Sequence, residues 1–134
     1  MTEIEIAENL ENILKKDENG KPIINLTPIK KTTINPKTQE EYDELMRVYE
    51  LGNWIWNNRS LATKLGCWKK YKEETCIGAG IDYSTKNKKI FGFCDKDFYL
   101  MVNWNIISTE EFYNMQKITP EMIKEINIYF EVRK

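Results

Sequence analysis

The chain has 134 residues, of which 31% are charged and 41% hydrophobic, and its formal net charge is −1. This size predicts one domain, and this composition is typical of a soluble globular protein and excludes a largely disordered chain. No apolar run reaches the roughly 20 residues that a transmembrane helix needs, so we expect no membrane partner. The sequence has no histidine, which removes the commonest general base and the commonest zinc ligand.

Charge is distributed unevenly along the chain. Residues 1–20 contain six acids and two lysines, a net charge of −4, whereas residues 53–90 contain eight cations and three acids, a net charge of +5. This asymmetry indicates either a binding face or an acidic arm that lies near a basic core.

The three cysteines, Cys67, Cys76 and Cys94, occur at spacings that match neither a metal knuckle nor a CxxC pair. We see no secretory signal peptide, so we expect reduced, buried and unreactive thiols in a cytoplasm. Without histidine, a Cys–His nucleophile is excluded. We therefore predict no catalytic cysteine, no metal and no cofactor.

Residues 1–36 are predicted to form an N-terminal extension. A capping box at Thr2 and Glu5 and the apolar residues after it predict an acidic helix that ends near Lys16. Asn19-Gly20 is a strong turn signal, and the stretch after it, broken by Pro28, predicts one or two short extended pieces at a sheet edge. The apolar face of the helix must be buried against its own domain, in a homodimer or on another protein.

Residues 37–118 are predicted to form the core domain, and residues 119–134 a C-terminal helix. Capping boxes begin at Thr38 and at Ser108, and Gly52 is expected to be the C′ residue of the first helix. The predicted elements are a helix at 39–51, a strand at 53–57, a loop or short helix at 61–74, strands at 75–83 and 89–94, a helical turn at 96–101, a strand at 105–107, a helix to about 116 and a helix from 120. The fold class is α+β, with a small, mostly antiparallel sheet of three to four strands and helices packed on one face.

The main candidate site is an aromatic and basic cluster, which we call the Trp/Lys cluster. Aromatic faces interleaved with cations can stack bases and hold phosphates, whereas buried indoles with solvated lysines are the usual arrangement in a small core. Alternation along the predicted strand places two of its tryptophans on one face, so both are buried or both exposed. The cluster contains Trp54, Trp56, Arg59, Lys64, Trp68, Lys69, Lys70, Tyr71 and Lys72.

Two weaker candidates lie downstream. Gly78-Ala79-Gly80 follows a strand, but it lacks the spacing of a phosphate-binding loop, so a bulge, a turn or a close neighbour is expected there. Asp95 and Asp97 lack the rest of a calcium loop, and Asp95 fits a helix cap better than a metal ligand. The remaining carboxylates considered for magnesium or acid–base chemistry are Asp82, Glu73 and Glu74.

Several short motifs together resemble a small uncharacterised module of bacteriophage and prophage proteins. The motifs are EYDELM, GNWIW, WxxYKxxTCI, FGFCDKDFY and IISTEEF, and they span roughly residues 40–117. The chain departs from the module at Asn53, at Phe98 and by an insertion at 78–88. The resemblance implies a small phage protein made in the cytoplasm of an infected bacterial host, and it assigns no catalytic residue.

These observations lead to three functional hypotheses. The first is a non-enzymatic phage protein that binds and inhibits a host protein, such as an anti-defence inhibitor of the anti-CRISPR type, with a homodimer through residues 1–36 as a further option. The second is a nucleotide-binding module that sequesters a defence signal in the Trp/Lys cluster. The third is a metal-dependent hydrolase that uses the aspartates.

Overall fold

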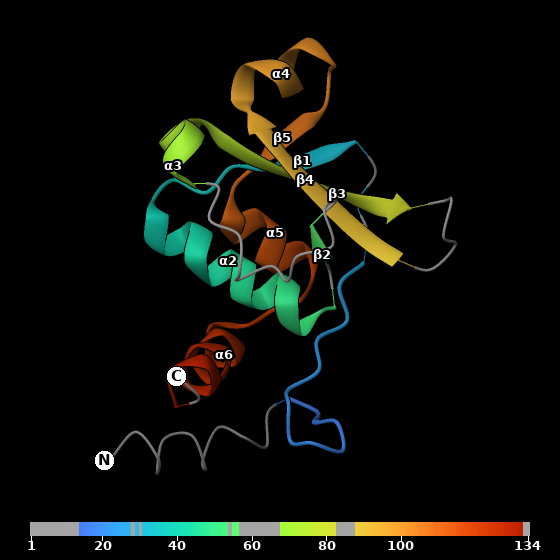
Figure 1. Ribbon diagram of the computed structural model, residues 1–134, viewed down its shortest axis with the longest axis vertical. Helices are drawn as coiled ribbons and strands as arrows, with labels where there is room; N and C mark the ends of the chain where they lie inside the picture. The colour runs from blue at the N-terminus through green and yellow to red at the C-terminus, as the bar shows by residue number, and fades with distance from the viewer. Residues whose placement is uncertain are drawn as a thin grey trace.

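The computed structural model of the protein describes residues 14–27, 29, 31–53, 55–56, 68–82 and 88–132, with the backbone alone for 55–56, 79–82 and 88–95 (Figure 1). Within these residues the elements are β1 (Thr32–Ile34), α2 (Gln39–Leu51), β2 (Ile55–Trp56), α3 (Trp68–Tyr71), the 3-10 turn η2 (Lys72–Glu74), β3 (Thr75–Asp82), β4 (Lys88–Asp95), α4 (Lys96–Met101), β5 (Asn105–Ile107), α5 (Thr109–Met115) and α6 (Pro120–Val132).

The strands form one mixed sheet in the order β2-β4-β3-β1-β5. β3 is antiparallel to both β1 and β4, whereas β1 pairs with β5 and β2 pairs with β4 in parallel. The α+β class is confirmed. The described residues form five strands, whereas three to four were expected. Two of the four strand pairs are parallel, whereas a mostly antiparallel sheet was expected. The outer strands β2 and β5 have two and three residues, too few to reveal their pairing by alternation.

β1 lies between β3 and β5, so the expected edge position of this stretch is wrong for residues 32–34. The Thr33 side chain is fully buried, and the Asn35 N–H donates to the Ile107 carbonyl at 2.9 Å. A strand from the predicted N-terminal extension therefore lies inside the sheet of the predicted core domain.

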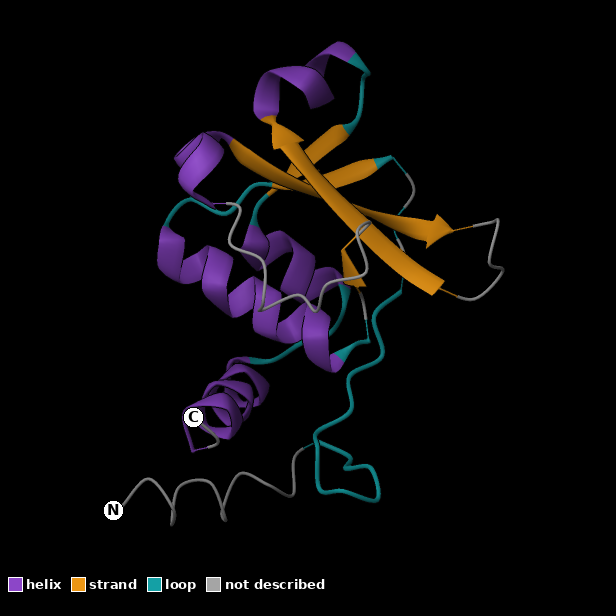
Figure 2. Cartoon of the chain, viewed as in Figure 1, coloured by secondary structure: helices purple, strands orange, loops and turns teal. Residues whose placement is uncertain are grey.

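The main core lies between the sheet and α2. Leu45, Val48 and Tyr49 of α2 are almost completely buried, and they belong to one apolar cluster with Ile34 and Ile77 of the sheet. The helices α2 and α5 lie on the same side of the sheet, with α6 beyond them (Figures 1 and 2). The positions of α2, α5 and α6 agree with the predicted packing of helices on one face of the sheet, but the prediction is wrong for α4.

α4 differs from the other helices because it covers the opposite face of the sheet. Ile77 points into the α2 core, so its neighbour Gly78 faces the other way. A Cβ at Gly78 would lie 2.5 Å from the Tyr99 hydroxyl and 3.0 Å from Trp104 Cζ3. The glycine thus permits these rings to rest on the backbone of β3. The β3–β4 register is unbroken, so the expected bulge is absent from the described strands, while the close neighbour is present.

The segment before β1 is a long loop that runs away from the sheet (Figure 2), and it bonds to Gln116 at the end of α5 and to Glu125 of α6. Residues 14–16 are not helical, so the predicted helix does not reach Lys16, and the Leu14 N–H donates to the Glu125 carboxylate of α6 at 3.1 Å. Residues 1–13, which hold the rest of the predicted helix, lie outside the described residues. The predicted turn at Asn19-Gly20 is confirmed, with Gly20 at φ 79°. Leu14, Ile24 and Leu26 are buried in the protein's own core.

The predicted helix starts are confirmed. The hydroxyls of Thr38 and Ser108 accept from backbone N–H groups three residues later, at 3.1 and 3.0 Å. The expected C′ role of Gly52 is wrong, because the left-handed residue is Asn53, at φ 62°. Gly52 is the C-cap itself, with φ −84°.

Candidate functional site

Part of the Trp/Lys cluster lies in α3 and η2. The Trp68 indole is half-buried against the core and lies 5.9 Å from the Tyr42 ring, so it is only partly available for stacking. The side chains of Lys69, Lys70 and Lys72 are exposed. The Lys70 ammonium lies 5.3 Å from the Tyr71 ring, a cation–π distance. This half of the cluster therefore shows solvated lysines around a partly buried indole.

The other half of the cluster is not described. Trp54, Arg59 and Lys64 lie outside the described residues, and for Trp56 only the backbone in β2 is described.

The other sequence candidates do not form a site in the part of the chain that the structure describes. Glu73, Glu74 and Asp97 are exposed, and no described group of three His, Cys, Asp or Glu side chains is close enough to share a metal ion. The side chains of Asp82 and Asp95 are outside this part. Cys76 is fully buried, as expected, and its backbone pairs with that of Cys94 across β3 and β4.

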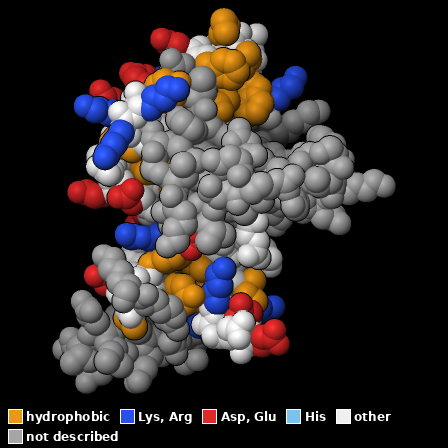
Figure 3. Space-filling view, in the orientation of Figure 1, with side chains coloured by type: hydrophobic (Ala, Val, Ile, Leu, Met, Phe, Trp, Pro, Cys, Tyr) orange, Lys and Arg blue, Asp and Glu red, His pale blue; other side chains and the backbone are white. Residues whose placement is uncertain are grey.

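A group of exposed apolar side chains on α4 and the turn after it was not predicted. We call it the α4 surface, and it comprises Phe98 (41% exposed), Leu100 (55%), Met101 (73%) and Val102 (40%). Hydrophobic side chains gather over α4 at one end of the molecule (Figure 3). The sequence signal was the run FYLMV, which is apolar on every side of a helix too short to be enclosed.

The C-terminal end of α4 is closed by backbone hydrogen bonds and by the packing of Tyr99. Tyr99 is buried, and its carbonyl accepts from the Trp104 N–H at 3.0 Å, while Asn103 adopts φ 61° and donates to the Leu100 carbonyl at 3.2 Å. This is a Schellman motif, completed by the contact between the Tyr99 and Trp104 rings at 5.2 Å. α4 therefore buries one aromatic side chain and presents the rest of its apolar side chains to solvent.

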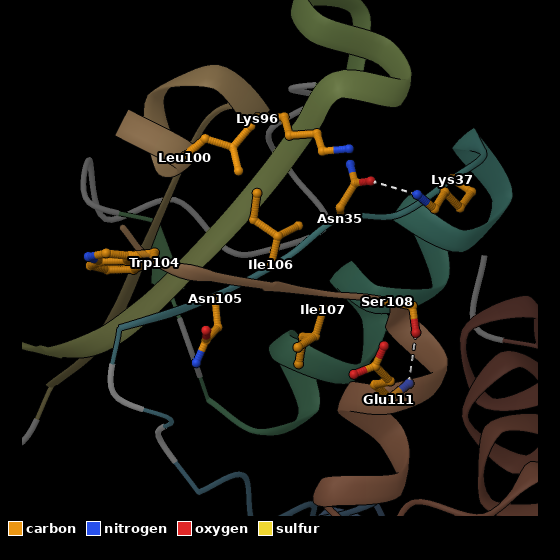
Figure 4. A pocket seen from close by; sticks show the side chains of 10 residues that line it. All are labelled: Asn35, Lys37, Lys96, Leu100, Trp104, Asn105, Ile106, Ile107, Ser108 and Glu111. Atoms are coloured by element: carbon orange, nitrogen blue, oxygen red, sulfur yellow. Dashed lines mark hydrogen bonds between the residues drawn. The ribbon is translucent and has the colours of Figure 1, made fainter. Parts of the chain in front are cut away.

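A cavity of about 520 Å³ lies between α4, β5 and the segment after β1 (Figure 4). The Trp104 indole lies on the left of this view and two lysine side chains on the right. Glu111 and Ser108 line the lower side of the cavity in this view, and the Ser108 hydroxyl accepts from the Glu111 N–H. Its lining residues include Lys37, Lys96, Leu100, Trp104, Asn105 and Ile106.

Asn35 is the structural support of this cavity. Its buried amide donates to the Glu73 and Thr75 carbonyls at 2.9 and 2.8 Å and accepts from the Lys37 ammonium at 3.1 Å. These bonds fix the cavity wall to the start of β3. Among the described residues, neither Lys37 nor Lys96 forms an ion pair.

Comparison with known proteins gives no family: no protein-family model matches the chain, and no curated protein or solved structure matches it. The described helices include none with the length and apolar character needed to cross a bilayer.

Proposed function

We propose that the protein is a non-enzymatic binding protein that a bacteriophage makes in the cytoplasm of its bacterial host, where it inhibits a host protein. An anti-defence inhibitor of the anti-CRISPR type is the form of this activity that we favour. The phage setting is supported by the sequence resemblance over residues 40–117. The binding activity is supported by the α4 surface.

The observation that carries the proposal is the exposure of four large apolar side chains on one short segment, Phe98–Val102. Exposed apolar side chains that are contiguous and bordered by polar residues are typical of protein contact sites. Asp97 and Asn103, both exposed, and the half-buried Lys96 border this segment. The segment thus has the apolar centre and polar rim of a protein interface.

The α4 surface is also firmly positioned. Tyr99 beneath it is buried against Gly78 and Trp104, and the Schellman motif closes the helix. A contact surface that is ordered before binding loses little conformational entropy on binding, which favours affinity. The exposed lysines of α3 and η2 supply further charge for the same partner.

The test uses one pair of matched variants. Met101→Glu places a charge in the α4 surface, at a side chain that is 73% exposed. Met115→Glu places the same charge on α5, at a methionine that is 54% exposed. Proteins captured from host lysate by the parent chain are purified and titrated with the parent and both variants by calorimetry. The inhibitory effect of the parent chain on the purified host protein is then measured.

We expect the parent and Met115→Glu to bind and inhibit the same host protein, and Met101→Glu to bind about tenfold more weakly or worse. Equal binding by both variants would remove the α4 surface from the contact. A captured protein that binds without any loss of its activity would contradict inhibition.

A further inference from the structure

The cavity beneath α4 has two chemically different ends. Trp104, Ile106 and Leu100 supply an aromatic and aliphatic wall, and Lys37 and Lys96 supply two ammonium groups (Figure 4). Its volume of about 520 Å³ lies within the range of small-molecule sites. A ligand that fits must therefore carry an apolar ring at one end and negative charge at the other.

The charge of the lining limits the ligand further. Neither lysine is ion-paired among the described residues, so both ammonium groups can meet an anion. Glu111, also on the wall, opposes the entry of a highly charged ligand. Two cations against one carboxylate suit one phosphate group better than a triphosphate.

Two further polar side chains of the cavity lining, Asn105 and Glu111, add hydrogen-bonding capacity (Figure 4). Asn105 is exposed at the cavity, and its side-chain amide offers both donors and an acceptor. The Glu111 carboxylate can accept from hydroxyl groups. A heterocyclic base and a sugar make use of both groups, whereas a simple aromatic acid does not.

We propose that this cavity binds a nucleoside monophosphate, with the base against Trp104 and the phosphate between Lys37 and Lys96. The site is separate from the Trp/Lys cluster of α3, and it shares only Leu100 with the α4 surface. The proposal does not depend on the host-protein contact, so the two can fail independently.

The experiment is a titration of the isotopically labelled full chain, followed by amide chemical shifts in two-dimensional NMR spectra. Adenosine 5′-monophosphate is the probe, adenosine supplies the ring without the charge, and inorganic phosphate supplies the charge without the ring. The Lys37→Gln/Lys96→Gln variant removes both cations, and Lys69→Gln/Lys72→Gln is the matched control on α3 and η2. All four lysines are at least partly exposed, so both variants are expected to fold.

We expect the monophosphate to shift the amides of Asn105, Ile106 and Glu111 and to bind at least about tenfold more tightly than adenosine or phosphate. The cavity variant should weaken binding by more than about tenfold, and the control variant by less than about twofold. Equal affinity for phosphate and the monophosphate would indicate an adventitious ion only and overturn the proposal. Shifts centred on Lys69–Lys72, or no shift at millimolar nucleotide, would also overturn it.

Discussion

The Lys16 ammonium lies 2.5 Å from a carboxylate oxygen of Glu125, across a sequence separation of 109 residues. The second carboxylate oxygen accepts from the Leu14 N–H at 3.1 Å, and Lys16 also donates to the Leu14 carbonyl at 2.7 Å. Glu125 is only 3% exposed, whereas Lys16 is 23% exposed. One buried acid on α6 thus fastens the N-terminal segment to the C-terminal helix.

We expect Lys16→Met to lower the free energy of unfolding by about 3 kcal/mol, because it leaves a buried carboxylate without its cation. Glu125→Gln should cost less, because the partly exposed Lys16 can turn toward water while the amide oxygen still accepts from Leu14. Urea unfolding of both single variants and the double variant measures the coupling. Strictly additive effects of the two substitutions would contradict this account.

The sequence predicted the elements that depend on local signals. The helices at 39–51 and 120–132 begin where capping residues predict, because the cap oxygen and the N–H that it satisfies are three residues apart. The hairpin strands and the strand at 105–107 also match, since alternation and turns are read within a few residues.

The features that the sequence did not predict depend on distant contacts. Nothing near Thr32–Ile34 indicates that this short strand lies between β3 and β5, or that Lys16 meets Glu125. The cavity combines the segment after β1 with α4, β5 and α5, and no local pattern joins them. The apolar run that forms the α4 surface is visible in the sequence. Its exposure is not, because the run does not show that Tyr99 alone is buried against the sheet.

Gly78 is predicted to be essential for the packing of α4. In Gly78→Ala the new methyl group would lie 2.5 Å from the Tyr99 hydroxyl and 3.0 Å from Trp104 Cζ3, so the Tyr99 ring must move away from β3. We expect a loss of about 2 kcal/mol in unfolding free energy, as for overpacking in other cores. Thermal or urea unfolding measures it.

Tyr99→Phe provides the matched test of that clash. It removes the atom nearest to the new methyl group, so Gly78→Ala should cost less in a Tyr99→Phe background than in the parent. The rescue should be partial, because Trp104 Cζ3 would still lie 3.0 Å from the methyl group. An unchanged cost in both backgrounds would show that Tyr99 does not limit this position.

Lys117 offers a stabilising substitution. It is the C′ residue of α5, with φ 60°, and the Ile118 N–H completes the Schellman motif by donating to the Tyr113 carbonyl at 2.8 Å. Glycine adopts this conformation without the Cβ clash, so Lys117→Gly should raise the unfolding free energy by about 1 kcal/mol. Lys124→Gly, in the middle of α6, is the control and should lower it by about 1 kcal/mol. A lower stability for Lys117→Gly would contradict the proposed strain.

Alkaline pH is predicted to destabilise the fold through two tyrosines. Burial, with a smaller effect from Tyr99, raises the pKa of Tyr49, and burial, followed by the nearby Glu44 carboxylate, raises the pKa of Tyr113. An acid whose pKa is raised by folding keeps its proton in the folded state after the unfolded chain has lost it. Stability is therefore unaffected below the unfolded pKa of about 10 and falls as the pH rises above it.

Each tyrosine should contribute a slope of about 1.4 kcal/mol per pH unit above that pKa. Urea unfolding at a series of pH values from neutral to strongly alkaline measures the combined slope. Tyr49→Phe and Tyr113→Phe should each lower this combined slope by the contribution of one tyrosine, about 1.4 kcal/mol per pH unit. The double variant should lower it by the contributions of both tyrosines. A Tyr49→Phe slope equal to that of the parent would mean that the phenol ionises in the folded state as readily as in the unfolded chain, and that its burial against Leu45 and Phe112 is not maintained in solution.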